Sequence, residues 1–566
     1  MRRAVELGYD ALGITDRDGL YGIVRAHEAA HAAGLRLVVG CELTIDAPSG
    51  TGPGTPWTLL VHVENHAGYT HLCRVLTESH RRHPKGKRTK GRGDEELPAN
   101  LHAGVPVEVL AQHAEGLFCT VLPRPRPQAA FDLTALGVLR DAFGERLSIG
   151  VHRHGDGEDG RVLAAAKLAS AKLGVPCVLH NGVRLATAEE KPVLDVLYCI
   201  REGVMLDEAG RSLLPNAEAR LKSEAEMRAL FPEHPEWEAR ARSIAEACRF
   251  SMQELRYKFP NDGDYPGETP DEALRRLSYE GAARRYAGVI PDKVRAQIEK
   301  ELGLIAQLEV ATYFLCVRSI VEIARQKDIL CQGRGSAANS AVCFCIGITA
   351  VDPARSSLLF ERFLSPERRE PPDIDVDFEH DRREEVIQAI YERYGRDRAA
   401  MVSEVICYRG KSALREVGKV FGFSLEQVER LSSLVTWWDT LKEVSPLRLR
   451  EAGFEGDDAR VRMCLAMSQA IQGFPRHLSV HVGGFVLSAT PLEEIAPVEP
   501  ATMPDRTVVP WDKDDIDALG FFKVDVLGLG ILTAIRKAMV LARDHENAFP
   551  SSSTPLDMLA AIPAED

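Results

Sequence analysis

Apolar residues in the N-terminal part of the chain alternate between helical spacing and strand-like runs. Helical spacing over 21–33 is followed by a strand-like run over 35–40. The alternation returns as strand-like runs over 117–122, 147–151 and 175–179, with helical spacing over 161–173. Strands that alternate with helices predict an α/β domain, for which a barrel-like sheet is one arrangement.

Helical spacing dominates the remainder of the chain. It covers 222–251, 293–308, 315–324 and 382–394, and then 412–434 and 458–471. The last two patterns predict a small helical insertion between two strand-like runs, 373–378 and 521–527. If these two runs share a site, they must come back together in space.

The run 373–378 carries a carboxylate at every second position. On a strand, alternate side chains point to the same face. The residues predicted to share one face are Asp373, Asp375 and Asp377, and those predicted to enter a core are Ile374, Val376 and Phe378. A fourth carboxylate, Asp525, lies in the second run.

Carboxylates crowded on one face raise each other's pKa unless a cation lies between them. A charged edge strand that discourages aggregation is the alternative explanation. It accounts neither for the Pro371-Pro372 pair before the strand nor for Asp525 in the second run. The pattern therefore favours a divalent metal site, and Mg²⁺ is the expected ion because it binds carboxylates, substrate phosphates and water.

A glycine-rich turn over 333–340 precedes the acidic run. Such a turn, followed by a helix N-terminus, can bind phosphate through backbone N–H groups. It is not a Walker loop, because no Gly-Lys-Ser/Thr closes it. Lys523 lies two residues before Asp525, on the same predicted face, where it could neutralise phosphate or pair with an aspartate.

A basic cluster lies in the predicted insertion. Its members are Arg409, Lys411, Arg415 and Lys419, and the last three are four residues apart. Three cations on one helix face repel one another, so a polyanion partner is favoured over a merely solvated face. We interpret the cluster as a contact to the DNA backbone. By contrast, the two histidines of 476–484 are expected to be hydrogen-bonded residues, since their spacing does not suggest a metal site.

Composition limits the class of protein. The chain has 566 residues, enough for three or four domains, with 45% hydrophobic residues. No apolar run has the length of a membrane span and no signal region follows the N-terminus, so a cytoplasmic protein is expected. Twelve cysteines without a C-x-x-C pair are expected to be reduced thiols. A net charge of -13 argues against binding of nucleic acid by bulk charge, although local basic clusters remain.

Several of these motifs together resemble one family, the bacterial C-family DNA polymerases, whose type member is the polymerase III α subunit. The segments that carry the resemblance are 333–340, 360–364, 372–378, 412–418 and 523–525. The segments 331–332, 368–372, 474–478 and 511–515 resemble the error-prone, damage-inducible branch of that family.

The resemblance implies a polymerase β-like nucleotidyltransferase palm with an inserted helical thumb. It assigns two Mg²⁺ ions to Asp373, Asp375 and Asp525, and leaves Asp377 a supporting role. The incoming triphosphate would be bound by Arg334, Gly335, Ser336 and Lys523. The implied partners are primer-template DNA and deoxynucleoside triphosphates, with damage-response proteins and the sliding clamp as further partners of the full-length family.

The first part of the chain resembles a PHP domain, but with fewer metal ligands than metal-binding members. Asp16 and Glu42 are present, whereas Arg17 stands where a histidine is usual and Arg184 stands where an Asp-x-His motif is expected. The His-x-His strand that opens such domains is absent before residue 1. We therefore expect no metal and no phosphoesterase activity here.

The expected organisation is an α/β multidomain chain. Its expected parts are a PHP-like domain lacking its first strand (1–215), linking helices and the first part of the palm (216–404), a thumb-like insertion (405–485), the second part of the palm (486–535) and the start of truncated fingers or a tail (536–566). The favoured function is error-prone DNA synthesis by two-metal phosphoryl transfer. A catalytically impaired DNA-binding remnant that lacks fingers is the alternative.

Overall fold

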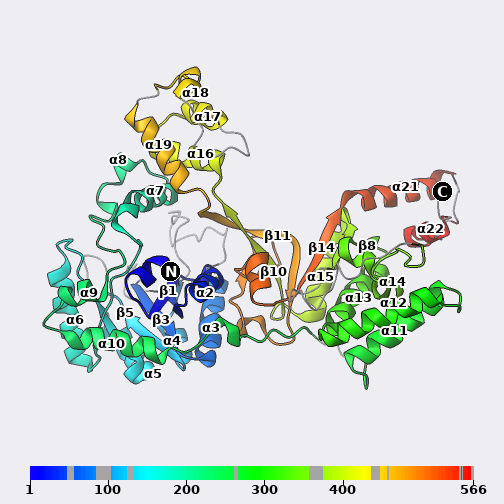
Figure 1. Ribbon diagram of the computed structural model, residues 1–566, viewed down its shortest axis with the longest axis horizontal. Coiled ribbons are helices and arrows are strands. Elements are labelled where there is room, and N and C mark those ends of the chain that lie inside the picture. Colours follow the sequence, from blue (N-terminus) through cyan, green and yellow to red (C-terminus); the bar gives the residue numbers. More distant parts are fainter. Residues whose placement is uncertain are drawn as a thin grey trace, which may run out of the picture. The chain divides into compact units, whose positions relative to one another are not determined.

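A computed structural model describes residues 1–46, 57–83, 104–123, 133–260, 265–355, 374–434, 446–455, 458–546, 550 and 552–562 (Figure 1). The chain divides into two compact units. The first contains 1–75, 102–251 and 405–479, and the second contains 76–101, 252–404 and 480–566. Each unit is built from segments that are far apart in the sequence.

A mixed sheet forms the centre of the first unit. Its strands are β1 (Ala11–Arg17), β2 (Arg36–Ile45), β3 (Trp57–Val63), β4 (Gly104–Val105), β5 (Leu117–Val121), β6 (Leu147–Val151) and β7 (Cys177–Leu179). They follow the order β1-β2-β3-β5-β6-β7, with β4 beside β2. In the pairings of the described residues, β1 and β7 are the two ends of this order, so the sheet is an open half-barrel rather than a closed ring.

Helices accompany these strands in the alternation that the sequence predicts. They are α1 (Arg2–Glu6), α2 (Ile23–Ala32), α3 (His66–Arg82), α4 (Val107–Gln112), α5 (Leu133–Phe143), α6 (Asp159–Leu173), α7 (Lys191–Glu202), α8 (Leu206–Ala209), α9 (Glu224–Leu230) and α10 (Pro235–Ala247). The α/β prediction is confirmed. Strand β3 was not predicted, although its burial alternates from residue to residue.

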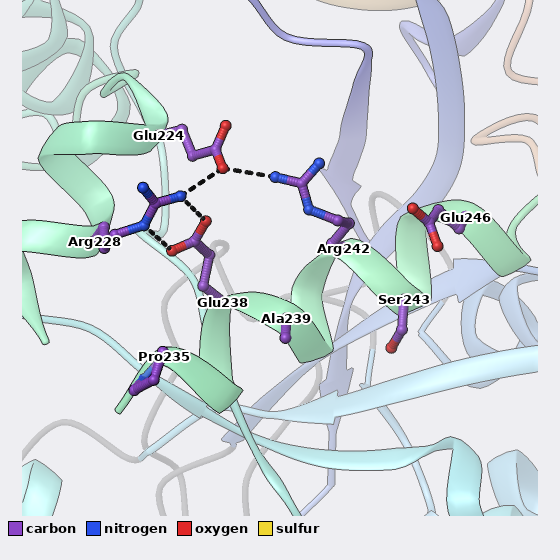
Figure 2. Close-up of a pocket in the computed structure, with 8 residues that line it drawn as sticks. All are labelled: Glu224, Arg228, Pro235, Glu238, Ala239, Arg242, Ser243 and Glu246. Atoms are coloured by element: carbon purple, nitrogen blue, oxygen red, sulfur yellow. Dashed lines mark hydrogen bonds and ion pairs between the residues drawn. The ribbon is translucent and has the colours of Figure 1, made fainter. Parts of the chain in front are cut away.

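The helix predicted over 222–251 is two helices. Pro235 begins α10, where its fixed φ suits the first turn and its missing N–H costs no helical hydrogen bond. Two ion pairs join α9 to α10, Arg228 to Glu238 and Arg242 to Glu224, and Arg228 also pairs with Glu224 within α9, as Figure 2 shows. The hollow of about 320 Å³ between them is therefore lined by charges that largely neutralise one another.

The inserted helices are α16 (Gly410–Val420), α17 (Leu425–Ser433), α18 (Pro446–Glu451) and α19 (Ala459–Ala470). The stretch 412–434, predicted to be helical, forms two helices, because the structure breaks it at Gly422, whose φ of 70° lies in the left-handed region. Ser424 then caps α17 by accepting a hydrogen bond from the Gln427 N–H. The insertion shares an apolar core with α7 and α8, which includes Val196 and Leu414.

A second seven-stranded sheet has the order β12-β13-β10-β11-β14-β9-β8. The strands are β8 (Cys331–Arg334), β9 (Asp375–Glu379), β10 (Ala399–Cys407), β11 (Pro475–Leu487), β12 (Glu499–Pro500), β13 (Thr507–Val508) and β14 (Lys523–Leu529). Strand β9 lies between β14, to which it is parallel, and β8, to which it is antiparallel. The two strand-like runs of the sequence are thus neighbours.

The helices of this unit are α11 (Pro270–Arg285), α12 (Asp292–Gln307), α13 (Ala311–Gln326), α14 (Ala341–Cys345), α15 (Arg383–Tyr394), α20 (Lys513–Ala518), α21 (Gly530–Glu546) and α22 (Pro555–Ala561). In the described part of the chain, no single helix is long and apolar enough to cross a membrane. By length and composition alone, α12 and α13 pass such a test only as a pair, bent by 114°.

The apolar face of β9 packs as predicted. Ile374, Val376 and Phe378 are at most 1% exposed and belong to one core with Val524 and Val526 of β14. Because side chains alternate along the strand, this burial sends the carboxylates of β9 to the opposite face.

Tyr313 of α13 ties the beginnings of β9 and β14 together. Its buried hydroxyl accepts a hydrogen bond from the Ile374 N–H at 2.9 Å and donates to the Lys523 carbonyl at 3.3 Å. A single side chain from the helical layer therefore fixes how these two strands start beside one another.

Replacing Tyr313 by Phe removes the shared hydroxyl and leaves the buried Ile374 N–H without that acceptor. We expect the free energy of unfolding to fall by about 1–3 kcal/mol, measured by urea denaturation. The control is Tyr279→Phe in the same unit, whose hydroxyl bonds to the exposed Glu299, and which should change stability by less than about 0.5 kcal/mol. Equal effects from the two substitutions would contradict the role given to Tyr313.

Candidate active site

Strand register brings four distant residues into one row across the second sheet. Gly484 of β11 is opposite Asp525 of β14, Asp525 is opposite Asp375 of β9, and Asp375 is opposite Arg334 of β8. Cross-strand partners present their side chains on the same face. The row therefore places two carboxylates side by side, with a glycine at one end and a guanidinium at the other.

Two cations neutralise the carboxylates of this face. The Lys523 Nζ lies 2.5 Å from Asp525 Oδ2, and the Arg334 Nε lies 2.9 Å from Asp377 Oδ2. An Arg334 Nη2 is also 3.9 Å from Asp375 Oδ2. Asp377 is 5% exposed and is matched by Arg334 as its own cation.

The close approach of two carboxylates changes the pKa of Asp375. Burial raises its pKa above the ordinary value, and the adjacent Asp525 carboxylate raises it further, whereas Arg334 and Lys523 act in the opposite direction. Asp525 is 4% exposed, and its Oδ1 has no hydrogen-bond partner among the described residues. A buried carboxylate oxygen without a partner, beside a second carboxylate, fits a divalent cation.

The third predicted ligand, Asp373, lies outside the described residues. Within the described ranges, no group of three or more His, Cys, Asp or Glu side chains is arranged to hold a metal ion. The pair Asp375 and Asp525 is thus the described part of the predicted ligand set.

The glycine-rich turn lies beside this pair. Gly335 begins a short 3-10 helix (Gly335–Asn339) with φ of 63°, and a Cβ built on it would lie 3.7 Å from Asp375 Oδ2. The backbone of the turn therefore approaches the carboxylates closely. Of the predicted residues here, Ser336 has a described backbone within this helix but no described side chain.

The helix that follows the turn does not offer its N-terminus to a phosphate. The Ala341 and Val342 N–H groups of α14 donate to the buried Glu301 carboxylate, each at 2.9 Å, and the Ser340 hydroxyl donates to it at 2.8 Å. The sequence-based prediction that this helix dipole binds an anion is corrected accordingly. An anion at this turn would therefore bind to backbone N–H groups that precede Ser340.

The predicted basic cluster lies on and just before α16. Lys411, Arg415 and Lys419 are exposed on the face opposite its buried residues, and Arg409 is the residue that precedes the helix. Glu416 lies 3.2 Å from Lys419 and 3.5 Å from Arg476. Lys419 thus has an acidic neighbour, whereas Lys411 and Arg415 have no ion pair within the described residues.

His481 was treated as an ordinary hydrogen-bonded residue, and its hydrogen bonds are present. Its Nδ1 accepts from the Gly484 N–H at 2.7 Å and lies 3.9 Å from Asp525 Oδ1. Sequence reasoning missed this proximity to the carboxylates. The signal that could have revealed it is the glycine pair directly after the histidine, since glycines mark close approach of backbone to another group.

The acidic residues of the first unit are engaged within the protein. Asp16 accepts from the Gly22 N–H at 2.6 Å, and Glu42 pairs with Arg184 at 2.6 Å. Asp18 accepts from both the N–H and the hydroxyl of Thr44, and burial raises its pKa to about 6. Arg184 thus neutralises Glu42, one of the two PHP-type ligands that were expected from the sequence.

Parts of the chain match two protein families. Residues 272–528 match the family model described as the bacterial DNA polymerase III alpha NTPase domain, and residues 1–148 match the PHP domain. Error-prone DNA polymerases of Anaeromyxobacter dehalogenans (strain 2CP-C) and Dechloromonas aromatica (strain RCB) are each 44% identical over all of this chain. Over its whole length the chain is similar to error-prone DNA polymerases.

The chain spans about half the length of these error-prone DNA polymerases. It covers 55% of the Anaeromyxobacter protein and 52% of the Dechloromonas protein. The error-prone DNA polymerase of Pseudomonas syringae pv. syringae (strain B728a) is 44% identical over 96% of this chain and 50% of its own length. A solved structure described as a metal-dependent phosphoesterase, from Bifidobacterium adolescentis, is aligned with 32% of this chain and 79% of its own length. Its sequence identity is 14% and its TM-score is 0.24.

Replacing Asp375, whose side chain is 26% exposed, by Asn removes one of two adjacent negative charges. Because the folded-state pKa of Asp375 is raised, the wild-type chain loses stability as the pH rises through that pKa. In EDTA at pH 7 we expect Asp375→Asn to unfold at a higher temperature than wild type. As the pH is lowered toward the ordinary pKa of a carboxylic acid, the difference in unfolding temperature between the two proteins should become smaller.

The control is Asp381→Asn, because Lys537 lowers the pKa of Asp381. Its stability contribution is present above the ordinary carboxyl pKa, so this substitution should leave the unfolding temperature at pH 7 unchanged or lower it. Differential scanning calorimetry gives both values. An unfolding temperature of Asp375→Asn at or below that of wild type would contradict the electrostatic cost assigned to Asp375.

Proposed function

We propose that this chain carries the nucleotidyl-transfer site of a DNA-directed DNA polymerase that adds deoxynucleotides to a primer 3′-end. The observation that carries the proposal is the row Gly484, Asp525, Asp375 and Arg334, with Lys523 beside it. It puts two carboxylates against two cations on one face of a sheet. A metal-dependent phosphoryl transfer needs acidic ligands for divalent ions and cations for the phosphates.

The proposed metal ligands are Asp373, Asp375 and Asp525, and the proposed ion is Mg²⁺. Carboxylates and phosphate oxygens are the ligands that Mg²⁺ favours. When bound, two such ions would lower the pKa of the primer hydroxyl and neutralise charge on the leaving pyrophosphate. The first unit, whose Glu42 already pairs with Arg184, is proposed to hold no metal.

Lys523 and Arg334 are proposed to bind the triphosphate, together with the backbone of Gly335 and Ser336. In the structure both cations pair with aspartates of the site. In these pairs the two cations neutralise the aspartates, as bound metal ions would, and the aspartates neutralise the cations, as substrate phosphates would. Arg334 can exchange partners readily, because its side chain is 53% exposed.

The face of α16 is proposed to contact the phosphate backbone of primer-template DNA. Lys411 and Arg415 support this role most directly, since they are exposed and have no ion pair among the described residues. Lys419 and Arg409 extend the same basic surface. Contacts of this kind position DNA without reading its sequence.

The similarity to error-prone DNA polymerases supports a role in translesion synthesis during repair of DNA damage. Damage-response proteins and the sliding clamp are proposed partners of the whole protein. We also propose that the sequence-based boundaries of palm, thumb and fingers apply, with the thumb inserted between β10 and β11.

Primer extension tests the catalytic assignment. With Mg²⁺, template-primer and deoxynucleotides, the unaltered chain is expected to extend the primer, and Asp375→Ala and Asp525→Ala are each expected to lower the rate by at least about 10³-fold, the scale expected when charge at the transition state loses its stabilising group. Glu233→Ala on an exposed loop of the first unit is the control and should retain full activity.

Gel-shift binding of the same DNA separates the two hypotheses for this chain. Extension that depends on Asp375 supports the polymerase. Binding of DNA without any extension by the folded, unaltered chain would instead identify a non-catalytic remnant and overturn the proposal.

The salt dependence of DNA affinity tests the basic face of α16. If Lys411 and Arg415 each neutralise a phosphate, Lys411→Ala and Arg415→Ala should each reduce the slope of log K against log salt by about 1, on duplexes of any sequence. Arg228→Ala is the control, because Arg228 is already paired with Glu224 and Glu238. Unchanged slopes for both test variants would show that DNA does not contact this face.

A further inference from the structure

The segment 481–484 of β11 has a local structure that the proposed function leaves unexplained. The His481 side chain bonds to the backbone of its own strand, two and three residues further along. Its Nδ1 accepts hydrogen bonds from the Gly484 N–H at 2.7 Å and from the Gly483 N–H at 3.3 Å. A side chain thus satisfies two backbone donors of a strand at the point where that strand passes the active-site row.

This arrangement defines the state of the imidazole. A ring nitrogen that accepts a hydrogen bond uses its lone pair, so Nδ1 carries no proton and the neutral ring has its proton on Nε2. The distance of 3.9 Å between His481 Nδ1 and Asp525 Oδ1 is too long for a hydrogen bond. His481 therefore acts on Asp525 through the backbone of the glycine pair and not by direct contact.

A second side chain holds the same segment. Arg383, at the beginning of α15, donates a hydrogen bond to the Val482 carbonyl, between the histidine and the glycines. The backbone from 481 to 484 is therefore fixed at its N–H groups by His481 and at a carbonyl by Arg383. Two independent contacts on four residues indicate that the position of this backbone matters.

The glycine pair lets the backbone of β11 lie close to Asp525 and its strand. A Cβ built on Gly484 would lie 3.2 Å from Asp525 Oδ1, 3.1 Å from Lys523 Cδ and 2.8 Å from His481 Nδ1. A Cβ built on Gly483 would lie 2.2 Å from the Val526 carbonyl oxygen. The Asp525 oxygen that lies nearest to Gly484 is the one without a hydrogen-bond partner among the described residues.

We propose that His481 is a positioning residue of the polymerase site. By binding the Gly483 and Gly484 N–H groups it fixes the strand opposite Asp525, and so keeps Asp525 Oδ1 uncovered and oriented for a divalent cation. This inference rests on the proposed function, because it assigns His481 a part in the site that Asp375 and Asp525 form.

Two substitutions at one position separate the backbone role from other roles of the ring. In His481→Asn the side-chain oxygen can accept from the N–H groups two and three residues ahead, as asparagine does in turns, but the Nε2–H is lost. In His481→Leu the volume is largely kept and both nitrogens are lost. The control is His477→Leu, an exposed histidine earlier on the same strand.

The first measurement is the affinity for Mn²⁺, by electron paramagnetic resonance, without DNA or nucleotide. We expect His481→Leu to weaken binding by about 10–100-fold, the usual effect of losing a residue that orients a metal ligand. His481→Asn and His477→Leu should bind as the unaltered chain does, and Asp525→Asn should lose the site.

The second measurement is the steady-state kinetics of primer extension. His481→Leu should lower kcat by about 10²-fold, as expected for misplaced reacting groups, with a smaller change in the KM for the nucleotide. His481→Asn should restore most of kcat. A role of His481 in stability alone would change the unfolding temperature without this separation of kcat from KM.

Several outcomes would overturn the proposal. One is Mn²⁺ affinity and kcat of His481→Leu equal to those of the unaltered chain. Another is His481→Asn as defective as His481→Leu, which would assign the role to Nε2. If His481→Leu does not fold, Gly484→Ala keeps the histidine but puts a methyl group against His481 Nδ1 and Asp525 Oδ1; normal Mn²⁺ binding by Gly484→Ala would equally contradict the proposal.

The two readouts also separate this inference from the proposed function. Failure of the unaltered chain to extend primers would count against the polymerase assignment. The comparison of Mn²⁺ affinities would still decide whether His481 positions Asp525.

Discussion

The repulsion between the carboxylates of Asp375 and Asp525 is the constraint on which the arrangement of the second unit depends. Burial and mutual proximity both raise the pKa of Asp375, so the fold must hold the two groups together against an electrostatic cost. Strand pairing does this. The parallel register of β9 and β14 sets Asp375 opposite Asp525, and the hydrogen bonds of the ladder cannot shift by one residue without turning the apolar face of β9 into solvent.

Contacts outside the strands keep that register from relaxing. Tyr313 joins the beginnings of β9 and β14 through one hydroxyl. At the other end of β9, Arg536 of α21 binds the buried Glu379 and also the Asp328 side chain. Asp375 therefore lies on a strand anchored at both ends, as a site that must hold its groups to within a fraction of an ångström requires.

Charge balance within the site explains why its cations have partners. Lys523 and Arg334 lie on the face that carries the carboxylates, and each pairs with one. Similar pairing occurs in the first unit, where Arg184 binds Glu42. There Arg184 neutralises Glu42, whereas in the second unit a buried carboxylate oxygen lacks a partner among the described residues. We therefore expect a divalent cation at Asp525 but none at Glu42.

The sequence by itself determined many of the elements and the identity of the chemical groups. Alternation in 373–378 was sufficient to separate the carboxylates from the core residues, because side chains on a strand alternate strictly between faces. Residue spacing likewise located α6, α12, α15 and α19. The break at Gly422 was harder to predict, since a glycine can either continue a helix or end it in the left-handed region.

Only the tertiary structure decided which groups meet. The pairing of Asp377 with Arg334, the use of the α14 N-terminus by Glu301, and the approach of His481 to Asp525 all join residues that no local pattern connects. The sequence lists charges and donors, but their partners depend on strand order and register. Those are set by how the whole apolar core packs, because a strand of a few residues has several neighbours that would satisfy its backbone equally well.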